Sequence, residues 1–145
     1  MAGSELHDIA AARLRGAGQR YTTGRRTLVD VLDRAEGPLT IPQILELDRT
    51  LAQSSAYRNL AVLEQALVVH RIVTNDDFAR YELAEDLTEH HHHLICRQCG
   101  GVADFTLDPA VEGELDRVLA RVAATMSFEP DHHRLDLVGL CVDCS

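Results

Sequence analysis

The four cysteines of this chain fall into two identical short motifs, Cys96-x-x-Cys99 and Cys141-x-x-Cys144. Two such pairs let four thiolates surround one zinc ion as a tetrahedron, which leaves no open position for chemistry. The alternatives are two disulfides or a thioredoxin-like redox pair. Disulfides are disfavoured because the first residues lack the basic-then-apolar pattern of a signal peptide, and a redox motif needs only one pair. The spacing therefore predicts a structural zinc site.

Four consecutive histidines, His90 to His93, come shortly before the first cysteine pair. If this segment is a strand, successive side chains point to opposite faces. His90 and His92 then share one face, and His91 and His93 share the other. One tetrapeptide can thus contribute to two different metal sites, each completed by ligands from elsewhere. An internal affinity tag and a solvated polar strand are the alternative interpretations of this run.

Further nitrogen and oxygen ligands lie near the ends of predicted elements, namely His70, Glu82, Asp104, Glu112, His132 and His133. Mixed ligands of this kind suit zinc, iron, manganese or nickel, and they leave a site open to regulation. We expect His132 to face solvent, because neighbours on a strand oppose each other. We also expect His7 to be a surface residue of a flexible terminus.

The composition indicates a folded protein of one ordinary domain or two small ones, since 46% of the 145 residues are hydrophobic and 26% are charged. No apolar run approaches the roughly 20 residues that cross a bilayer. We therefore expect no membrane partner and a cytoplasmic location, where thiols stay reduced. The net charge of −9 argues weakly against nucleic acid. Arginines near the N-terminus nevertheless keep DNA binding open: Arg13, Arg15, Arg20, Arg25 and Arg26.

The elements that must position these residues begin with four predicted helices. Apolar side chains recur with helical spacing in four segments: residues 5–17, residues from a cap at Thr22 or Thr23 to about Gly37, residues 41–47 after a cap at Thr40, and residues from Ser54 or Ser55 to Leu67. In the fourth helix the apolar stripe buries one face and leaves Tyr57 and Arg58 largely on another.

Two β-rich runs, 70–74 and 78–83, follow the helices and flank the turn residues 75–77, which predicts a hairpin. Helices followed by such a wing are typical of a winged helix-turn-helix domain over residues 1–84. A protein-binding module would give an equally good match to this pattern.

Residues 85–89 are polar and are interpreted as a hinge between two units. Beyond it, strands over 90–96 and 102–105, a helix over 111–122 and a strand over 133–140 give a ββαβ order. The fold class is therefore α+β, with a second unit over 90–145. That unit is small for an independent core, so a zinc ion and a partner subunit are both physically reasonable.

The chain resembles the ferric uptake regulator family of metal-sensing bacterial repressors from about Arg20 to Cys144. Four motifs carry the resemblance: Ser55-Ala-Tyr57-Arg58-Asn-Leu60 before Leu63-Glu64, Tyr81-Glu82-Leu83, His90-His-His-His93-Leu-Ile-Cys96-Arg-Gln-Cys99-Gly100, and Cys141-x-x-Cys144. No single motif is decisive, but their order and spacing together are highly specific.

The resemblance implies a homodimer with N-terminal winged-helix domains that bind double-stranded operator DNA. It places Ser55, Tyr57 and Arg58 on the recognition helix, where tyrosine can contact a thymine methyl and arginine can reach guanine or phosphate. Arg20 falls where the family has a basic residue that approaches the minor groove.

The resemblance also implies two metal sites besides the four cysteines. A sensory site would use Glu82, His91, His93 and Asp104, and His70 lies near the position from which zinc sensors take a ligand. A second site would use His90, His92, Glu112 and His133. Glu112 enters that set only with a one-residue insertion in the alignment.

These implications predict a metal-dependent repressor of metal-homeostasis genes, not an enzyme. Zinc is the expected signal. Iron, manganese and nickel are kept as alternatives, because the sensory site has no cysteine although zinc sensors commonly use one. A zinc hydrolase with Glu82 or Glu112 as the base is the rival from another class, but no His-Glu-x-x-His motif supports it. A metal buffer is the third alternative.

Overall fold

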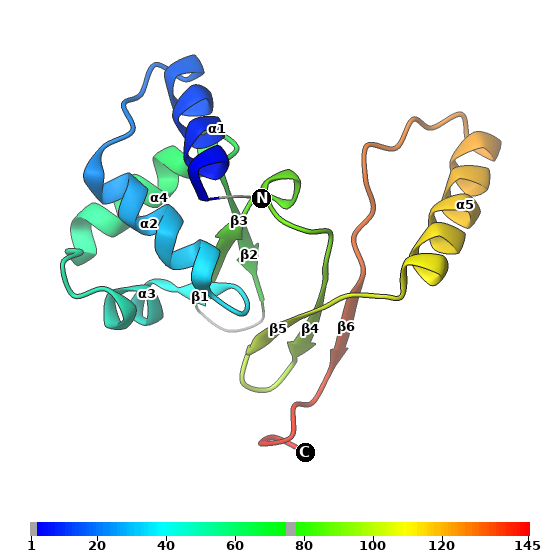
Figure 1. Ribbon diagram of the computed structural model, residues 1–145. Helices are drawn as coiled ribbons and strands as arrows, with labels where there is room; N and C mark the ends of the chain where they lie inside the picture. Colours follow the sequence, from blue (N-terminus) through cyan, green and yellow to red (C-terminus); the bar gives the residue numbers. More distant parts are fainter. Residues whose placement is uncertain (1–2, 75–77) are drawn as a thin grey trace.

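A computed structural model of the chain describes residues 3–74 and 78–145. Figure 1 shows a helical N-terminal part with a small sheet, followed by a second sheet and a separate helix. The elements in chain order are α1 (Gly3–Gly16), α2 (Thr23–Arg34), β1 (Leu39–Thr40), α3 (Ile41–Leu47), α4 (Gln53–Gln65), β2 (Val69–Val73), β3 (Ala79–Leu83), the 3-10 turn η1 (Glu85–Leu87), β4 (His92–Cys96), β5 (Val102–Phe105), α5 (Pro109–Thr125) and β6 (Asp136–Gly139).

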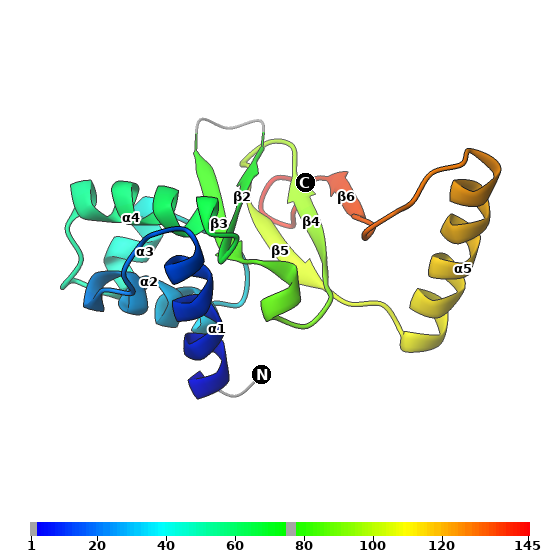
Figure 2. The same ribbon diagram turned by 90° about the horizontal axis from the view of Figure 1, so that it is seen from above.

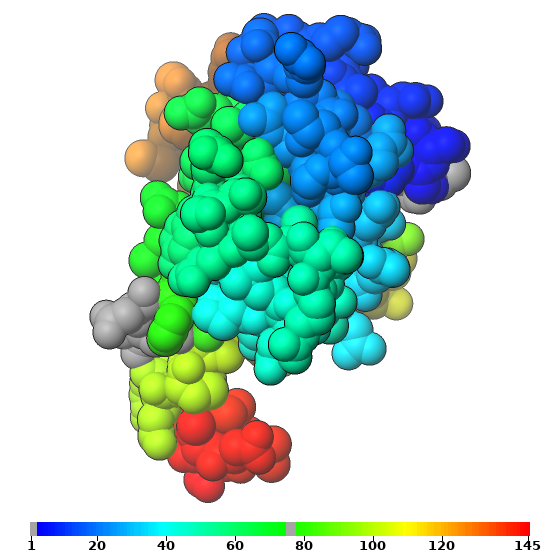
Figure 3. All heavy atoms as spheres, turned by 90° about the vertical axis from the view of Figure 1, so that its left-hand side faces the viewer, coloured from blue at the N-terminus to red at the C-terminus, as the bar shows by residue number. Residues whose placement is uncertain are grey.

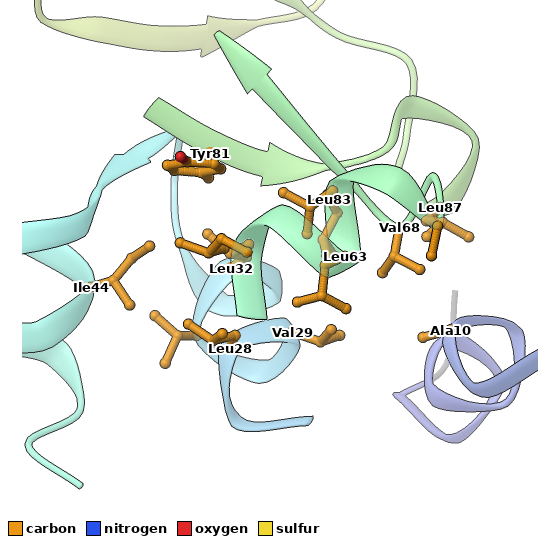
Figure 4. Close-up of a cluster of buried hydrophobic side chains, with 14 of the residues drawn as sticks. Ala10, Leu28, Val29, Leu32, Ile44, Leu63, Val68, Tyr81, Leu83 and Leu87 are labelled. Carbon is orange, nitrogen blue, oxygen red and sulfur yellow. The ribbon is translucent and has the colours of Figure 1, made fainter. Parts of the chain in front are cut away.

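The main hydrophobic core lies among the N-terminal helices and their sheet. Figure 4 shows Ala10 of α1, Val29 of α2 and Leu63 of α4 directed into a common interior, and all three are fully buried. The sheet has the antiparallel order β1-β3-β2 and contributes Tyr81 and Leu83 to the same core. Helices followed by this wing confirm the predicted winged helix-turn-helix part of an α+β fold.

Helix caps explain where two of the helices begin. The Thr22 hydroxyl accepts a hydrogen bond from the Arg25 amide at 3.3 Å, and Thr40 forms a capping box with Gln43 at the start of α3. The predicted cap of the fourth helix at Ser54 or Ser55 is wrong. The Ala52 carbonyl already accepts from the Ala56 amide at 2.9 Å, so both serines lie inside the first turn of α4.

Three further details of the N-terminal part differ from, or lie outside, the expectations. The two-residue strand β1 pairs Leu39 with Tyr81, and it is too short to leave a periodic signal in the sequence. His7 is not a loose surface residue, because its side chain is only 13% exposed and lies 2.5 Å from the Tyr21 hydroxyl and 2.7 Å from an Asp30 carboxylate oxygen. The predicted turn 75–77 lies outside the described residues.

The second sheet has the order β5-β4-β6, with β5 antiparallel and β6 parallel to the central strand. Helix α5 lies between β5 and β6 in the chain, as a parallel connection requires. The ββαβ order is thus confirmed, although β4 begins at His92 rather than His90, and β6 covers only Asp136–Gly139.

The segment between the two sheets is ordered rather than uniformly polar and exposed. Residues Glu85–Leu87 form η1, and the Leu87 side chain is only 2% exposed within the N-terminal core. Across the described residues, none of the helices is both long enough and apolar enough to span a bilayer.

Helix α5 stands away from the second sheet in two perpendicular views (Figures 1 and 2). Within α5, which the structure describes in full, only Ala123 is buried. An apolar stripe is left exposed along the helix at Val111, Val118, Leu119 and Val122. Leu137 and Val138 on β6 are exposed as well. The described part of the C-terminal unit therefore has little apolar core within one chain.

Candidate metal centres and DNA-facing surface

Strand pairing brings the two cysteine motifs together. Cys96 ends β4, and its parallel pairing with Gly139 of β6 carries the second motif alongside the first. The sulfur atoms of the cysteine group (Cys96, Cys99, Cys141 and Cys144) all lie within 4.8 Å of one another.

The geometry of the cysteine group fits a zinc ion better than a disulfide. All four thiols are free, and the Cys99 and Cys141 sulfurs are 3.9 Å apart. Sulfur ligands about 2.3 Å from zinc lie about 3.8 Å apart in a tetrahedron. Hydrogen bonds from the backbone amides of Cys99 and Cys141 lower the pKa of Cys96 to about 6, which favours the thiolate that zinc requires.

A second cluster, the bridging group, joins the wing to the second sheet. It contains Glu82 of β3, His91 just before β4, His93 of β4, and Asp104 of β5. Glu82 Oε2 lies 3.0 Å from His91 Nε2 and 3.1 Å from His93 Nε2. The Asp104 carboxylate is farther away, with oxygens 3.9 Å from His91 Nε2 and 3.6 Å from His93 Nε2.

A third cluster, the C-terminal histidine group, contains His90, His92, Glu112 and His133. The Glu112 carboxylate lies 2.9 Å from His90 Nε2, 2.8 Å from His92 Nε2 and 2.7 Å from His133 Nε2. The Nε2 atoms of His90 and His133 are themselves only 3.2 Å apart. Helix α5 supplies Glu112 from its first turn, and the segment before β6 supplies His133.

Both histidine clusters have the donor set and spacing of a coordination shell. Nitrogen or oxygen ligands about 2.1 Å from a metal ion are about 3.4 Å apart in a tetrahedron. The separations of 3.0–3.9 Å in the bridging group bracket that value, and those of 2.7–3.2 Å in the C-terminal histidine group lie just below it. Alternation along the histidine run puts His90 with His92 and His91 with His93, as the sequence predicts.

The ring nitrogens that point away from the clusters have partners of their own. His133 Nδ1 lies 3.0 Å from Asp116, His91 Nδ1 lies 2.9 Å from the Glu89 carbonyl, and His90 Nδ1 pairs with Glu85. Such outer contacts fix the tautomer that leaves Nε2 free to bind a metal. None of these partners was predicted from the sequence, although Asp116 lies one helical turn after Glu112.

The Nδ1 atoms of the buried residues His93 and His92 differ from these three. His93 Nδ1 lies 3.5 Å from Asp136 of β6. His92 Nδ1 is buried and has no hydrogen-bond partner among the described residues, so His92 is held by its Nε2 contact and by packing on Phe105.

Charge compensation shifts the pKa values within the bridging group. Burial raises the pKa of Glu82, but hydrogen bonds from His93 and His91 outweigh it and leave the pKa lowered. The hydrogen bond to Glu82 raises the pKa of His93. Burial raises the pKa of Asp104, which is farther from both rings. Glu82 is therefore the carboxylate of the group that is most strongly held in its charged form.

His70 is the one predicted sensory residue that the structure leaves outside both groups. It faces Glu82 across the β2–β3 ladder and, with His91 and His93, lines a cavity of about 870 Å³. Its ligand atoms are not among those that converge on Glu82. His132 is exposed, as expected from its position next to His133.

The predicted DNA-contacting side chains come from α4 and from the segment before α2. Tyr57 is 55% exposed, Arg58 and Arg20 are also exposed, and Ser55 is half-buried. Figure 3 shows a side of the molecule on which atoms of α4 lie next to those of the segment before α2. The surface thus carries two cations from segments well separated in sequence.

The family model and the relatives that match this chain point to one protein family. The ferric uptake regulator family model matches residues 16–138. The ferric uptake regulation protein of Campylobacter jejuni is 32% identical over 139 residues, which cover 91% of this chain and 83% of that protein. The peroxide operon regulator of Bacillus subtilis is 28% identical over 149 residues and covers 100% of this chain and 97% of that protein.

Solved structures agree with the sequence comparison. The Helicobacter pylori ferric uptake regulator, whose structure reveals three functional metal binding sites, superposes with a TM-score of 0.73 at 25% identity over 99% of this chain and 94% of that chain. A zinc-bound manganese uptake regulator gives a TM-score of 0.63 at 28% identity, covering 94% and 98% of the two chains.

Members of this family are metal-responsive transcription regulators and not enzymes. The zinc-hydrolase alternative is therefore set aside. The motifs, the winged helix-turn-helix, the three ligand clusters and the match over residues 16–138 lead to one conclusion. This chain belongs to the ferric uptake regulator family.

Proposed function

We propose that this protein is a metal-dependent, DNA-binding repressor of metal-homeostasis genes, with zinc as its signal. The observation that carries the proposal is the bridging group, because its four ligands come from both parts of the molecule. Glu82 lies on the wing, whereas His93 and Asp104 lie on the second sheet and His91 directly precedes its strand β4. A divalent cation bound there would cross-link the two parts.

The charges of the bridging group would make the link between the two parts depend on a bound metal ion. Glu82 and Asp104 carry negative charge close together, and the two imidazoles partly compensate it. Occupancy shifts a conformational equilibrium only by the difference in affinity between the two states. A DNA-competent arrangement is therefore favoured when Glu82 stays near His91 and His93.

On the DNA side, we propose that Arg20, Ser55, Tyr57 and Arg58 contact the operator. Tyr57 and Arg58 are exposed on α4, as groove contacts require. We propose a homodimer held through α5, whose exposed apolar stripe a second copy would cover. Two copies of α4 could then read the half-sites of a palindromic operator.

We further propose a division into a DNA-binding domain over residues 1–84, a hinge over 85–89 and a metal-binding dimerisation domain over 90–145, in a cytoplasmic protein. In this arrangement the cysteine group holds a structural zinc ion, and the C-terminal histidine group is a second metal site. His70, which lines the cavity beside the bridging group, is proposed to join that group as a sensory ligand when the group closes.

Zinc is preferred because imidazole and carboxylate ligands at tetrahedral spacing suit it. Iron, manganese and nickel accept the same ligands, and they are the alternatives within this proposal. A relative that is 28% identical is a zinc-bound manganese uptake regulator, which supports zinc as a ligand of this scaffold without restricting the signal to it.

The direct test is selection from an operator library by the purified protein, which retains its cysteine-bound zinc and is titrated separately with zinc, ferrous iron, manganese and nickel. We expect sequence-specific binding to appear with zinc at the lowest free concentration. Specific binding that appears only with another metal would change the signal but keep the repressor. Binding that is independent of every metal would overturn the proposal.

A further inference from the structure

Arg25, at the start of α2, connects the two segments that carry the proposed DNA contacts, namely α4 and the segment before α2. Its Nε–H donates to Asn59 Oδ1 of α4 at 3.1 Å. Its Nη1 donates to the Arg20 main-chain oxygen at 2.7 Å and to Gln19 Oε1 at 3.4 Å. One guanidinium group therefore joins the middle of α4 to the segment that carries Arg20.

Local structure holds Arg25 in the position that these contacts require. Its own amide donates to the Thr22 hydroxyl, which fixes the first turn of α2. Gly24 packs close to α4, since a Cβ at that position would be in van der Waals contact with Asn59 Nδ2 at 3.4 Å. Arg25 and Asn59 are both half-buried, in contrast to the exposed Arg20 and Arg58 on either side of the junction.

The contacts suit an arginine whose role is to position its neighbours. The planar fork of arginine can serve several acceptors in fixed directions, which a lysine ammonium group cannot reproduce. Asn59 directly follows Arg58, so the pair lies next to an exposed cation of α4. Holding a loop in place before binding removes part of its ordering cost from the binding step.

We propose that Arg25 and Asn59 form a positioning pair that sets the spacing between Arg20 and α4 before operator DNA binds. The inference rests on the proposed DNA-binding function. It adds two residues whose contribution to affinity is made through Arg20 and the recognition helix rather than through contact with DNA.

The test is a double-mutant cycle of Arg25→Ala and Asn59→Ala, with operator affinity measured at several salt concentrations. We expect each single variant to weaken binding about tenfold, since a hydrogen bond to a charged group is lost. The double variant should be no weaker than the weaker single variant, because both substitutions break one contact. Asn59→Ala should leave the salt dependence unchanged, because it removes no phosphate-neutralising charge.

Arg26 provides a matched control in the same turn of α2. Its guanidinium carbon lies 4.9 Å from the Tyr21 ring centre. Arg26→Ala and Asn59→Ala should therefore add when combined. Arg25→Lys retains the charge but not the planar fork, so it should recover only part of the affinity.

Three results would overturn the positioning pair. These are wild-type affinity of Asn59→Ala, full additivity of the Arg25 and Asn59 substitutions, or a loss in Arg25→Ala that Arg25→Lys restores completely. The last result would make Arg25 a simple phosphate contact. Thermal unfolding and zinc content of each variant separate misfolding from a binding defect. Failure of the wild-type protein to bind any operator would instead reject the proposed function, so the two failures are distinguishable.

Discussion

Among the single residues, Glu82 is central to the bridging group because one of its oxygens lies 3.0–3.1 Å from both histidine rings. We expect Glu82→Gln to lower metal affinity at this group by at least about 100-fold, more than loss of an outer-shell partner would. The cysteine-bound zinc should be retained. Zinc per chain and metal-dependent operator binding measure the two effects, and Glu46→Gln on the exposed face of α3 is the control. Metal-dependent binding that persists in Glu82→Gln would argue against the sensory assignment.

Asp116 does not belong to the C-terminal histidine group itself but contacts one of its members, His133, whose Nδ1 lies 3.0 Å away. We expect Asp116→Asn to weaken metal binding at the C-terminal histidine group by about 10–100-fold while the bridging group is unaffected. Competition of each variant with a zinc-binding dye measures the affinity. Glu114→Gln is the matched control, because Glu114 lies on the same helix but pairs with Arg117. Equal affinities of the two variants would contradict the outer-shell role.

At the level of elements, η1 is anchored to the N-terminal core by Leu87. Truncation of this buried side chain to alanine should lower the free energy of unfolding by about 2–5 kcal/mol, through lost burial and a residual cavity. Leu47→Ala is the control, since Leu47 is 64% exposed at the end of α3. Urea denaturation compares the two. A negligible effect of Leu87→Ala would show that η1 is held loosely.

Helix α5 presents an apolar stripe that no part of its own chain covers within the described residues. We expect Val118→Asp combined with Val122→Asp to halve the molecular mass in solution, because buried charge without a partner is costly at an interface. Arg117→Glu, a charge change at an exposed position of α5, should leave the mass unchanged. Sedimentation equilibrium makes the comparison, and an unchanged mass in the double variant would place the interface elsewhere.

At the scale of the whole molecule, stability is divided unequally between the two parts. Buried apolar side chains are numerous before residue 88, whereas beyond it, in the part of the chain that is described, they are Cys96 and Ala123. The C-terminal unit therefore depends on other constraints, and we propose that a structural zinc ion at the cysteine group and a partner subunit supply them.

We accordingly expect a strong chelator that strips the cysteine group to expose the C-terminal sheet before the N-terminal helices. Amide hydrogen exchange should accelerate in β4, β5 and β6, while α2 and α4 keep their protection. A chelator too weak to reach the cysteine group serves as the control. Uniform loss of protection over the whole chain would show that the two parts unfold as one unit.

The sequence by itself was sufficient wherever a local rule decides the outcome. Strand alternation depends only on backbone geometry, so the pairing of His90 with His92 and of His91 with His93 followed from their positions. The limits of α3 and the Thr40 cap also followed from local chemistry. The cap of α4 did not, because Ala52 begins that helix without any side-chain hydrogen bond.

Residue types and spacing alone left open which distant residues join each histidine pair; the family resemblance implied them, and the tertiary structure brings them together. Glu112 and His133 are 22 and 43 residues from His90, and they meet it because the chain crosses through α5 and returns to the sheet. The Arg25–Asn59 contact likewise spans 34 residues. Such convergence depends on how whole elements pack, whereas sequence spacing constrains only near neighbours. His70 shows the same limit, since its place on β2 left it beside the bridging group rather than within it.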